Sequence, residues 1–260
     1  MASMPGSKEK VSFEWPRIGY SFSLQLNRWL VKKSDTAKLI RRETTAMALF
    51  DKGNYKAASA AFRSLLTKDP RDTTALFYFA LCLYERKQFE RCLKYWARLK
   101  KINPKQLNLH LNMGCASQNL GRDSQAIRYF KRELKLNQLS GETLYSLGTL
   151  YYNARKFKKA APYLERCYRL RHSAEIIAGR LAYAYFKTKQ LGKEIDLYDD
   201  FLKEHPKDTW ALNNIGAALM QLAQYNRAQI YFRRASKIDP KNEMVLRNTK
   251  KARALSRRIN

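Results

Sequence analysis

The chain is poor in glycine, proline and cysteine, and it lacks long apolar runs. Among its 260 residues, 10 are Gly, 7 are Pro and 4 are Cys. So few glycines and prolines disfavour a turn-rich β protein and favour long helices. No run of about 18 apolar residues occurs, which predicts no membrane-spanning helix. No apolar h-region follows the N-terminus, so we expect a cytoplasmic protein, either free or peripheral to a membrane or large assembly.

The few cysteines also argue against disulfide or metal chemistry. They form no CxxC pair and show no metal-type spacing with the three histidines. Free cysteine packs as a small hydrophobic side chain, so we predict four reduced core residues: Cys82, Cys92, Cys115 and Cys167. The sequence has no glycine-rich phosphate loop, zinc-binding helix or nucleophile elbow. It therefore predicts no cofactor, no metal, no small-molecule substrate and no enzyme activity.

Acidic residues are scarce relative to basic ones. The chain carries 51 Lys and Arg against 22 Asp and Glu, a formal net charge of +29. This excess predicts attraction to a polyanion. Three partner classes stay open: an acidic protein, RNA or an anionic membrane surface. Hydrophobic residues make up 45% of the chain and aromatics 12%, a composition that folds.

The prolines that do occur reveal a repeat. Pro70, Pro104, Pro206 and Pro240 are separated by 34, 102 and 34 residues, and 102 is three times 34. Such a period is typical of helical repeat proteins. The best-formed unit begins at Thr209, and "place" below means the position of a residue within such a unit.

The same residue types recur at fixed places when the unit is shifted back in steps of 34. The seventh and eighth places hold an apolar and a small residue: Phe79-Ala80, Met113-Gly114, Leu147-Gly148, Leu181-Ala182 and Ile215-Gly216. Place 20 is small in Ala58, Cys92, Ala126, Ala160 and Ala228. Place 24 is large in Phe62, Trp96, Phe130, Leu164, Tyr198 and Phe232. This pattern closely resembles the tetratricopeptide repeat (TPR) family.

The resemblance implies an all-α fold, a right-handed TPR superhelix (α-solenoid) of six helix-turn-helix repeats plus a C-terminal cap helix. Six gapless units cover residues 39–242: 39–72, 73–106, 107–140, 141–174, 175–208 and 209–242. Residues 243–260 predict a basic cap helix. Residues 1–38 predict a disordered start followed by an apolar or amphipathic stretch that caps the first repeat, binds a partner or lies on a membrane.

The residue types at these places have a physical reason. Small residues at places 8 and 20 let the two helices of a unit approach closely, and the large residue at place 24 fills the gap to the next unit. No unit buries its apolar face alone, so the units must stack. The fifth unit departs from the pattern, with Glu194 at place 20 and Phe201 at place 27. We expect looser or bulkier packing there.

The resemblance also implies a concave groove lined by places 2, 5, 9 and 12 of the first helices. These places are rich in aromatic residues, which suit a partner peptide or amphipathic helix. The predicted groove residues are Phe50, Phe77, Leu81, Tyr84, Leu111, Tyr145, Tyr152, Tyr183, Phe186 and Trp210.

Basic residues recur at the exposed places of the predicted second helices. They form a predicted basic ridge on the convex face, which Asp199 and Asp200 interrupt in the fifth unit. The ridge consists of Arg98, Lys101, Lys131, Arg132, Lys135, Arg166, Arg169, Arg233, Arg234 and Lys237. It is either a solvated face or the contact surface of an acidic or phosphate-rich partner.

Three functional hypotheses follow. The first is a protein-interaction scaffold or assembly chaperone that holds a partner segment in the aromatic groove. The second is an assembly factor of a ribonucleoprotein that contacts RNA through the basic ridge. The third is a peripheral membrane adaptor that uses the apolar N-terminal stretch.

Overall fold

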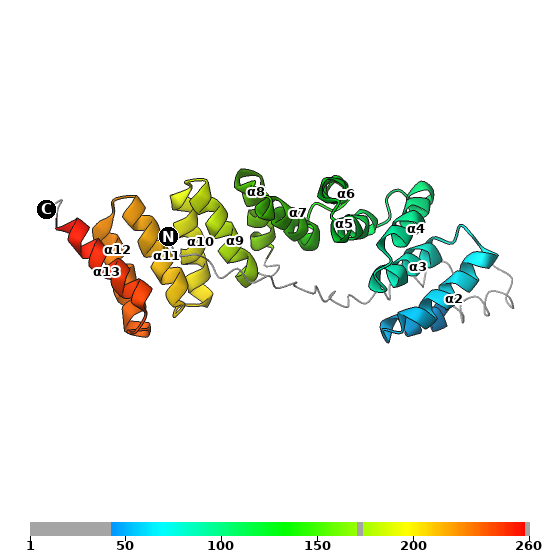
Figure 1. Ribbon diagram of the computed structural model, residues 1–260, viewed down its shortest axis with the longest axis horizontal. Helices are drawn as coiled ribbons and strands as arrows, with labels where there is room; N and C mark the ends of the chain where they lie inside the picture. Colours follow the sequence, from blue (N-terminus) through cyan, green and yellow to red (C-terminus); the bar gives the residue numbers. More distant parts are fainter. Residues whose placement is uncertain (1–42, 171–173, 258–260) are drawn as a thin grey trace.

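The protein is an all-α helical repeat solenoid (Figure 1). The computed structural model describes residues 43–170 and 174–257, and every regular element within them is a helix. A helix described over residues 43–51 comes first. It is followed by α2 (Tyr55–Lys68), α3 (Thr73–Glu85), α4 (Phe89–Ile102), α5 (Leu109–Asn119), α6 (Asp123–Leu136), α7 (Gly141–Asn153), α8 (Phe157–Arg169), α9 (Ala174–Lys187), α10 (Leu191–Glu204), α11 (Thr209–Gln221), α12 (Tyr225–Ile238) and α13 (Glu243–Ser256).

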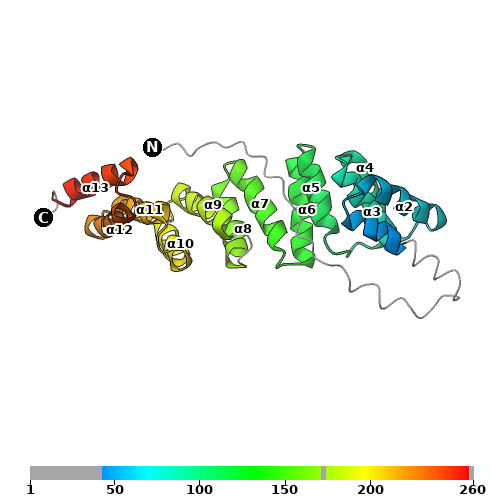
Figure 2. The ribbon, with the colours of Figure 1, turned by 90° about the horizontal axis from the view of Figure 1, so that it is seen from below.

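The helices stack in chain order. Each packs mainly against the helix before it and the helix after it. Figures 1 and 2 show the resulting row, with α2 at one end and α13 at the other. Odd-numbered helices are the first helices of the predicted units, and even-numbered helices are the second. The predicted N-terminal segment, residues 1–38, lies outside the described residues.

One contact recurs inside the units: the place-24 side chain covers the residue at place 8. A Cβ built on Gly216 would lie 2.5 Å from Cε1 of Phe232, and one on Gly148 would lie 2.7 Å from Cδ2 of Leu164. Real Cβ atoms do not approach that closely, so only glycine fits under these side chains. The place-24 residues Phe62, Trp96, Phe130, Leu164, Tyr198 and Phe232 are at most 2% exposed.

The turns between the two helices of a unit share an unusual backbone. Six residues spaced by 34 have positive φ: Gly53, Lys87, Gly121, Arg155, Lys189 and Ala223. Glycine adopts this left-handed conformation without strain, whereas a residue with a Cβ costs about 1–2 kcal/mol there. The turn geometry is therefore the same in all six units, although only two of them place glycine there.

First helices begin with a side-chain cap. Asp72, Ser140 and Asp208 precede α3, α7 and α11, and each side chain accepts a hydrogen bond from the N–H of the third residue onward. Asn242 caps α13 in the same way. A cap of this kind typically contributes about 1 kcal/mol because it satisfies an otherwise unpaired N–H. The caps recur with the repeat and define where the first helices start.

The third unit begins differently. Its first helix, α5, starts at Leu109 rather than at the predicted Leu107, because Asn108 has a φ of 60° and gives no side-chain cap. The buried Glu133 of α6 replaces that cap. Its carboxylate accepts hydrogen bonds from the N–H groups of Asn108, His110 and Leu111 at 3.0, 3.1 and 3.2 Å. Burial raises the pKa of Glu133, although these three N–H groups act in the opposite direction.

The fifth unit also buries a carboxyl group. Glu194, at place 20, is 6% exposed, and its Oε2 has no hydrogen-bond partner. Burial raises the pKa of Glu194 to about 7. Phe201, at place 27, is half-buried and stacks on His205 with ring centroids 4.4 Å apart. This unit therefore holds a buried carboxyl group, one oxygen of which has no hydrogen-bond partner, where the other units hold a small apolar residue.

We predict that Gly216→Ala destabilises the protein by about 1–3 kcal/mol, because the new methyl group would overlap the Phe232 ring. Gly192→Ala is the matched control, since a Cβ on Gly192 meets nothing within 4 Å. Because alanine favours helix over glycine, the control should gain up to about 1 kcal/mol. Urea unfolding followed by circular dichroism measures both. Equal stabilities of the two variants would contradict the place-8 contact.

We predict that Glu194→Gln stabilises the protein above pH 7 and not near pH 4.5. The folded-state pKa of about 7 lies above the usual 4.5, so stability falls as pH rises from 4.5 to 7 and stays low beyond it. The shift corresponds to about 3 kcal/mol at alkaline pH. Thermal unfolding at pH 4.5 and pH 8 measures it, with the exposed Asp196→Asn as control. Parallel pH profiles for Glu194→Gln and the parent would refute this prediction.

Candidate partner-binding surfaces

The first helices form one continuous surface, here called the inner face and made of α3, α5, α7, α9 and α11. Three hydrogen bonds with a sequence separation of 35 join first helices of consecutive units. Asn119 donates to the Tyr84 hydroxyl at 3.1 Å, Arg180 donates to the Tyr145 hydroxyl, and Asn248 donates to Asn213 at 2.9 Å. In the described part of the chain, no two second helices are in contact as closely as α7 with α9 or α11 with α13. First helices that approach one another line the concave side of a solenoid.

Rings and cations gather on the inner face between α7 and α9. Tyr183 is at the centre, with its ring centroid 5.9 Å from that of Tyr152 and 5.5 Å from that of Phe157. Tyr183 also stacks on Phe186 at 6.3 Å. This set, which we call the aromatic cluster, consists of Tyr145, Tyr152, Phe157, Arg180, Tyr183, Phe186 and Lys187.

The two cations of the aromatic cluster lie against its rings. Arg180 is 5.5 Å from the ring centroid of Tyr145, and the Lys187 Nζ is 5.2 Å from that of Tyr183. Burial raises the pKa of Tyr152, while Arg180 lowers it. Phe186 is 38% exposed, so the cluster reaches the surface. Exposed rings with fixed cations can bind an apolar side chain and an adjacent carboxylate.

The inner face continues from the aromatic cluster to Trp210. This residue is 39% exposed, and its ring makes an edge contact with Tyr198 at 5.3 Å. A Cβ on Gly179 would lie 3.4 Å from the Trp210 ring. The indole therefore lies close to the backbone of α9 at Gly179.

Not all predicted groove residues reach the surface. Phe77 and Leu111 are buried, at 7% and 1% exposed, because they pack into the core between helices. Leu81 is half-buried on α3. Phe50 and Tyr84, both at place 12, are half-buried and packed against other rings. The structure thus brings together the predicted residues of α7 and α9 and separates them from Phe77 and Leu111.

The aromatic partner at place 17 was absent from the predicted site. Three rings at place 12 meet a ring at place 17 of the same unit in an edge contact: Phe50 with Tyr55 at 5.4 Å, Tyr84 with Phe89 at 5.3 Å and Tyr152 with Phe157 at 5.5 Å. Place 17 is aromatic in four of the six units, as Tyr55, Phe89, Phe157 and Tyr225, so the repeat itself carries the signal. Part of each place-12 ring is therefore used inside its own unit.

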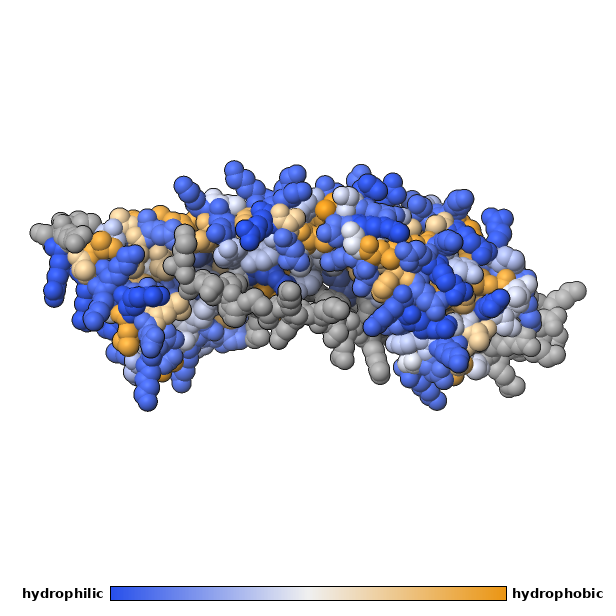
Figure 3. Space-filling view, in the orientation of Figure 1, coloured by the Kyte–Doolittle hydropathy of each residue, from blue (hydrophilic) through white to orange (hydrophobic). Residues whose placement is uncertain are grey.

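The ten predicted ridge cations are all exposed. Two of them also bind the preceding loop: Arg98 donates to the carbonyl of Pro70 at 3.0 Å, and Arg166 donates to that of Gln138 at 2.7 Å. Arg169 pairs with Glu165 at 2.5 Å. Hydrophilic side chains dominate the face seen in Figure 3. The ridge is thus accessible, and part of it also stabilises the junctions between units.

Asp199 and Asp200, which interrupt the ridge, connect second helices. The Tyr231 hydroxyl donates to Asp199 at 3.1 Å, and the Tyr168 hydroxyl donates to Asp200 at 3.0 Å. Burial and the nearby Asp199 raise the pKa of Tyr231. The acidic α10 is therefore held by a tyrosine of α8 on one side and one of α12 on the other.

The described residues offer little reactive chemistry. Residues 43–170 and 174–257 contain no group of three or more His, Cys, Asp or Glu side chains placed to hold a metal ion. None of their helices has the length and apolar character that a membrane span needs. The four cysteines are free, and burial raises the pKa of each thiol to about 12. These thiols stay protonated at neutral pH.

Two family profiles match the chain. The one described as "Tetratricopeptide repeat protein 21 C-terminal ARM domain" matches residues 24–215, and the one described as "Tetratricopeptide repeat" matches residues 210–242. Together with the stacked helix pairs, these matches define the class as a helical repeat protein. The chain belongs to the tetratricopeptide repeat family, through the profile of the protein 21 C-terminal ARM domain over most of its length.

The similar proteins of known name are diverse. The BBSome complex member BBS4 of Bos taurus is 29% identical over 124 residues, which are 47% of this chain and 24% of that protein. The type IV pilus assembly protein PilF of Pseudomonas aeruginosa is 25% identical over 112 residues, which are 42% of this chain and 44% of that protein. The chain thus spans less than half the length of either relative.

Two solved structures show the same fold. The TPR protein YrrB has a TM-score of 0.59 and 19% identity, and the match covers 74% of this chain and 99% of YrrB. The complex of Naa15/Naa10 bound to HypK-THB has a TM-score of 0.66 and 17% identity, and the match covers 84% of this chain and 34% of the other.

Proposed function

We propose that this protein is a protein-interaction scaffold that holds a peptide or amphipathic helix of a partner protein on its inner face. The aromatic cluster between α7 and α9 is the centre of the site. The proposal rests mainly on Phe186, which stays 38% exposed while it stacks on a network of rings from α7, α8 and α9. A rigid, exposed ring supplies contact area at little entropic cost.

The chemistry of the aromatic cluster suggests the partner segment. Arg180 and Lys187 lie beside the rings, so an apolar residue flanked by a carboxylate fits better than a purely apolar segment. YrrB, which shares the fold, has a peptide-binding site. BBS4 is a member of a complex and PilF an assembly protein, which agrees with a role in assembly.

A second candidate function is binding of RNA or another polyanion along the basic ridge, favoured by the exposure of all ten ridge cations. It differs from the first in its salt dependence, because binding by several phosphate contacts weakens roughly a thousandfold or more between about 50 and 200 mM salt. The membrane hypothesis rests on the N-terminal stretch and lies outside the described residues.

Photo-crosslinking can test the proposed site directly. A photoreactive phenylalanine replaces Phe186, and in a second protein it replaces Ile230, which is 56% exposed on α12. We expect the first to crosslink a defined partner segment in cell extract and the second not to. Mass spectrometry then names the segment, and a synthetic peptide of that sequence gives the affinity.

The affinity measurement decides between the surfaces. We expect Phe186→Ala to weaken the peptide roughly tenfold or more, as a central aromatic anchor does. The triple variant Lys131→Gln/Arg132→Gln/Lys135→Gln, on the ridge, should leave the affinity within about twofold. Two outcomes would overturn the inner-face site. One is crosslinks confined to position 230, and the other is a peptide affinity that falls in the ridge variant and not in Phe186→Ala.

A further inference from the structure

The last helix, α13, has the packing of a first helix. It begins at Glu243, 34 residues after α11 begins at Thr209, and Asn242 caps it as Asp208 caps α11. It contacts both α12 and α11. Asn248 donates to Asn213 across the same separation of 35 that joins other first helices. In the register of the repeat, α13 is the first helix of a seventh unit.

No second helix covers α13 among the described residues. In α11, the places that its second helix covers are apolar or small and buried: Leu212, Ile215, Gly216 and Leu219. The same places in α13 are Leu246, Thr249, Lys250 and Arg253. Leu246 is 45% exposed, and Lys250 and Arg253 are exposed as well. Charge thus replaces the apolar contact surface at this end.

On α12, the side that lines the same region is also more polar than the corresponding side of α10. In α10, places 21 and 28 are Ile195 and Leu202, which are 7% exposed. In α12 the same places hold Gln229 and Ser236, and the Ser236 Oγ is buried without a hydrogen-bond partner. Place 25 of α12 is the exposed Arg233. Both helices therefore present polar groups to a shared hollow.

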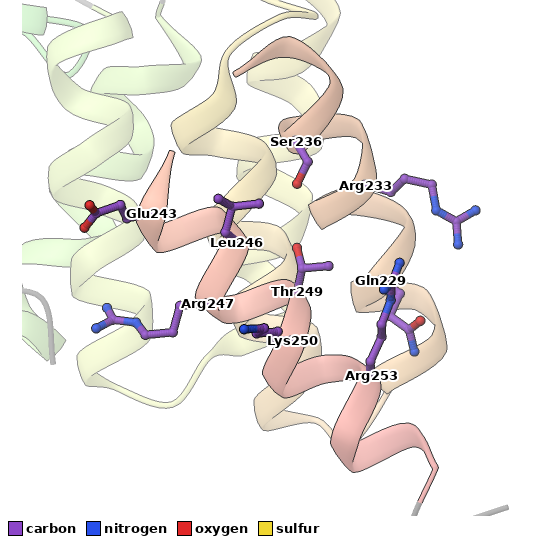
Figure 4. Close-up of a pocket in the computed structure, with 9 residues that line it drawn as sticks. All are labelled: Gln229, Arg233, Ser236, Glu243, Leu246, Arg247, Thr249, Lys250 and Arg253. Atoms are coloured by element: carbon purple, nitrogen blue, oxygen red, sulfur yellow. The ribbon is translucent and has the colours of Figure 1, made fainter. Parts of the chain in front are cut away.

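This hollow, which we call the end groove, has a volume of about 680 Å³. Figure 4 shows its lining, with Leu246 and Thr249 of α13 beside Ser236 of α12, and arginines around them. Arg233, Arg247, Lys250 and Arg253 line it together with a single carboxylate, Glu243. These four cations form no ion pair within residues 43–170 and 174–257.

We propose that the end groove binds an acidic helix of a protein partner, which packs on α12 and α13 as the second helix of the seventh unit. The chain contains its own precedent for an acidic second helix beside α12. The segment of α10, LGKEIDLYDDFLKE, carries five acidic and two basic residues, and Tyr231 of α12 donates to its Asp199. An acidic helix on the other side of α12 would repeat this arrangement and find four unpaired cations.

Binding of a defined peptide tests the proposal. The probe is a stapled helical peptide with the sequence of α10, Leu191–Glu204, and the control peptide has amides in place of its five carboxylates. Fluorescence anisotropy with the full 260-residue protein gives the affinities. We expect the acidic peptide to bind at least about tenfold more tightly than the amide peptide.

Matched variants locate the binding surface. The end-groove variant Arg247→Gln/Lys250→Gln/Arg253→Gln, which contains no ridge residue, should weaken the acidic peptide about tenfold. The ridge variant Lys131→Gln/Arg132→Gln/Lys135→Gln removes the same charge from α6 and should have little effect. All six residues are exposed, so both variants should keep the helical circular dichroism of the parent. Leu246→Ser should also weaken the peptide if a helix seats on the groove.

Three results would overturn the proposal. The first is absence of binding, and the second is equal loss in the end-groove and ridge variants, which would mean nonspecific attraction. The third is that the end-groove variant weakens the binding of a single-stranded RNA oligonucleotide more than it weakens the binding of the peptide. That result would assign the groove to nucleic acid. None of these results bears on the aromatic cluster, which is tested separately at Phe186.

Discussion

Each unit of this solenoid depends on how closely its two helices approach. Phe232 can lie on the backbone of α11 only because Gly216 has no side chain, and Leu164 lies on Gly148 in the same way. The ring or leucine then becomes part of the core shared with the next unit. Each unit contacts only its neighbours. A change in one such contact therefore alters the orientation of the units before it relative to the units after it. The positions of the inner face and the end groove both follow from this spacing.

This close approach of the helices also determines which side chains of successive first helices meet on their surface. Side chains from successive first helices meet at a separation of 35 residues, as Tyr145 does with Arg180. A cation can therefore be placed against a ring from a different unit without any loop holding it. The aromatic cluster is rigid because its members belong to α7, α8 and α9, which are fixed by the core beneath them. Such a surface loses little conformational entropy when a partner binds.

The repeat period was sufficient to predict the helices and most of the core, because the buried places recur with the same residue types. It was less informative where one residue type serves two purposes. Leu111 occupies a groove place but is 1% exposed, since it packs into the core between helices, as Phe77 does at the same place of the preceding unit. Arg98 and Arg166 read as solvated charge, yet each binds a carbonyl of the preceding loop. These contacts depend on distances between units, which a one-dimensional pattern does not contain.

The charge of the second helices differs along the solenoid. The acidic α10 lies between α8 and α12, whose segments are basic, and tyrosines of both donate to its aspartates. The other second helices, α2, α4 and α6, are basic as well, so α10 is the one acidic segment among the described second helices. Beyond α10, both α12 and α13 are basic. An acidic helix in the end groove would therefore give α12 an acidic neighbour on each of two sides, of which α10 already supplies one.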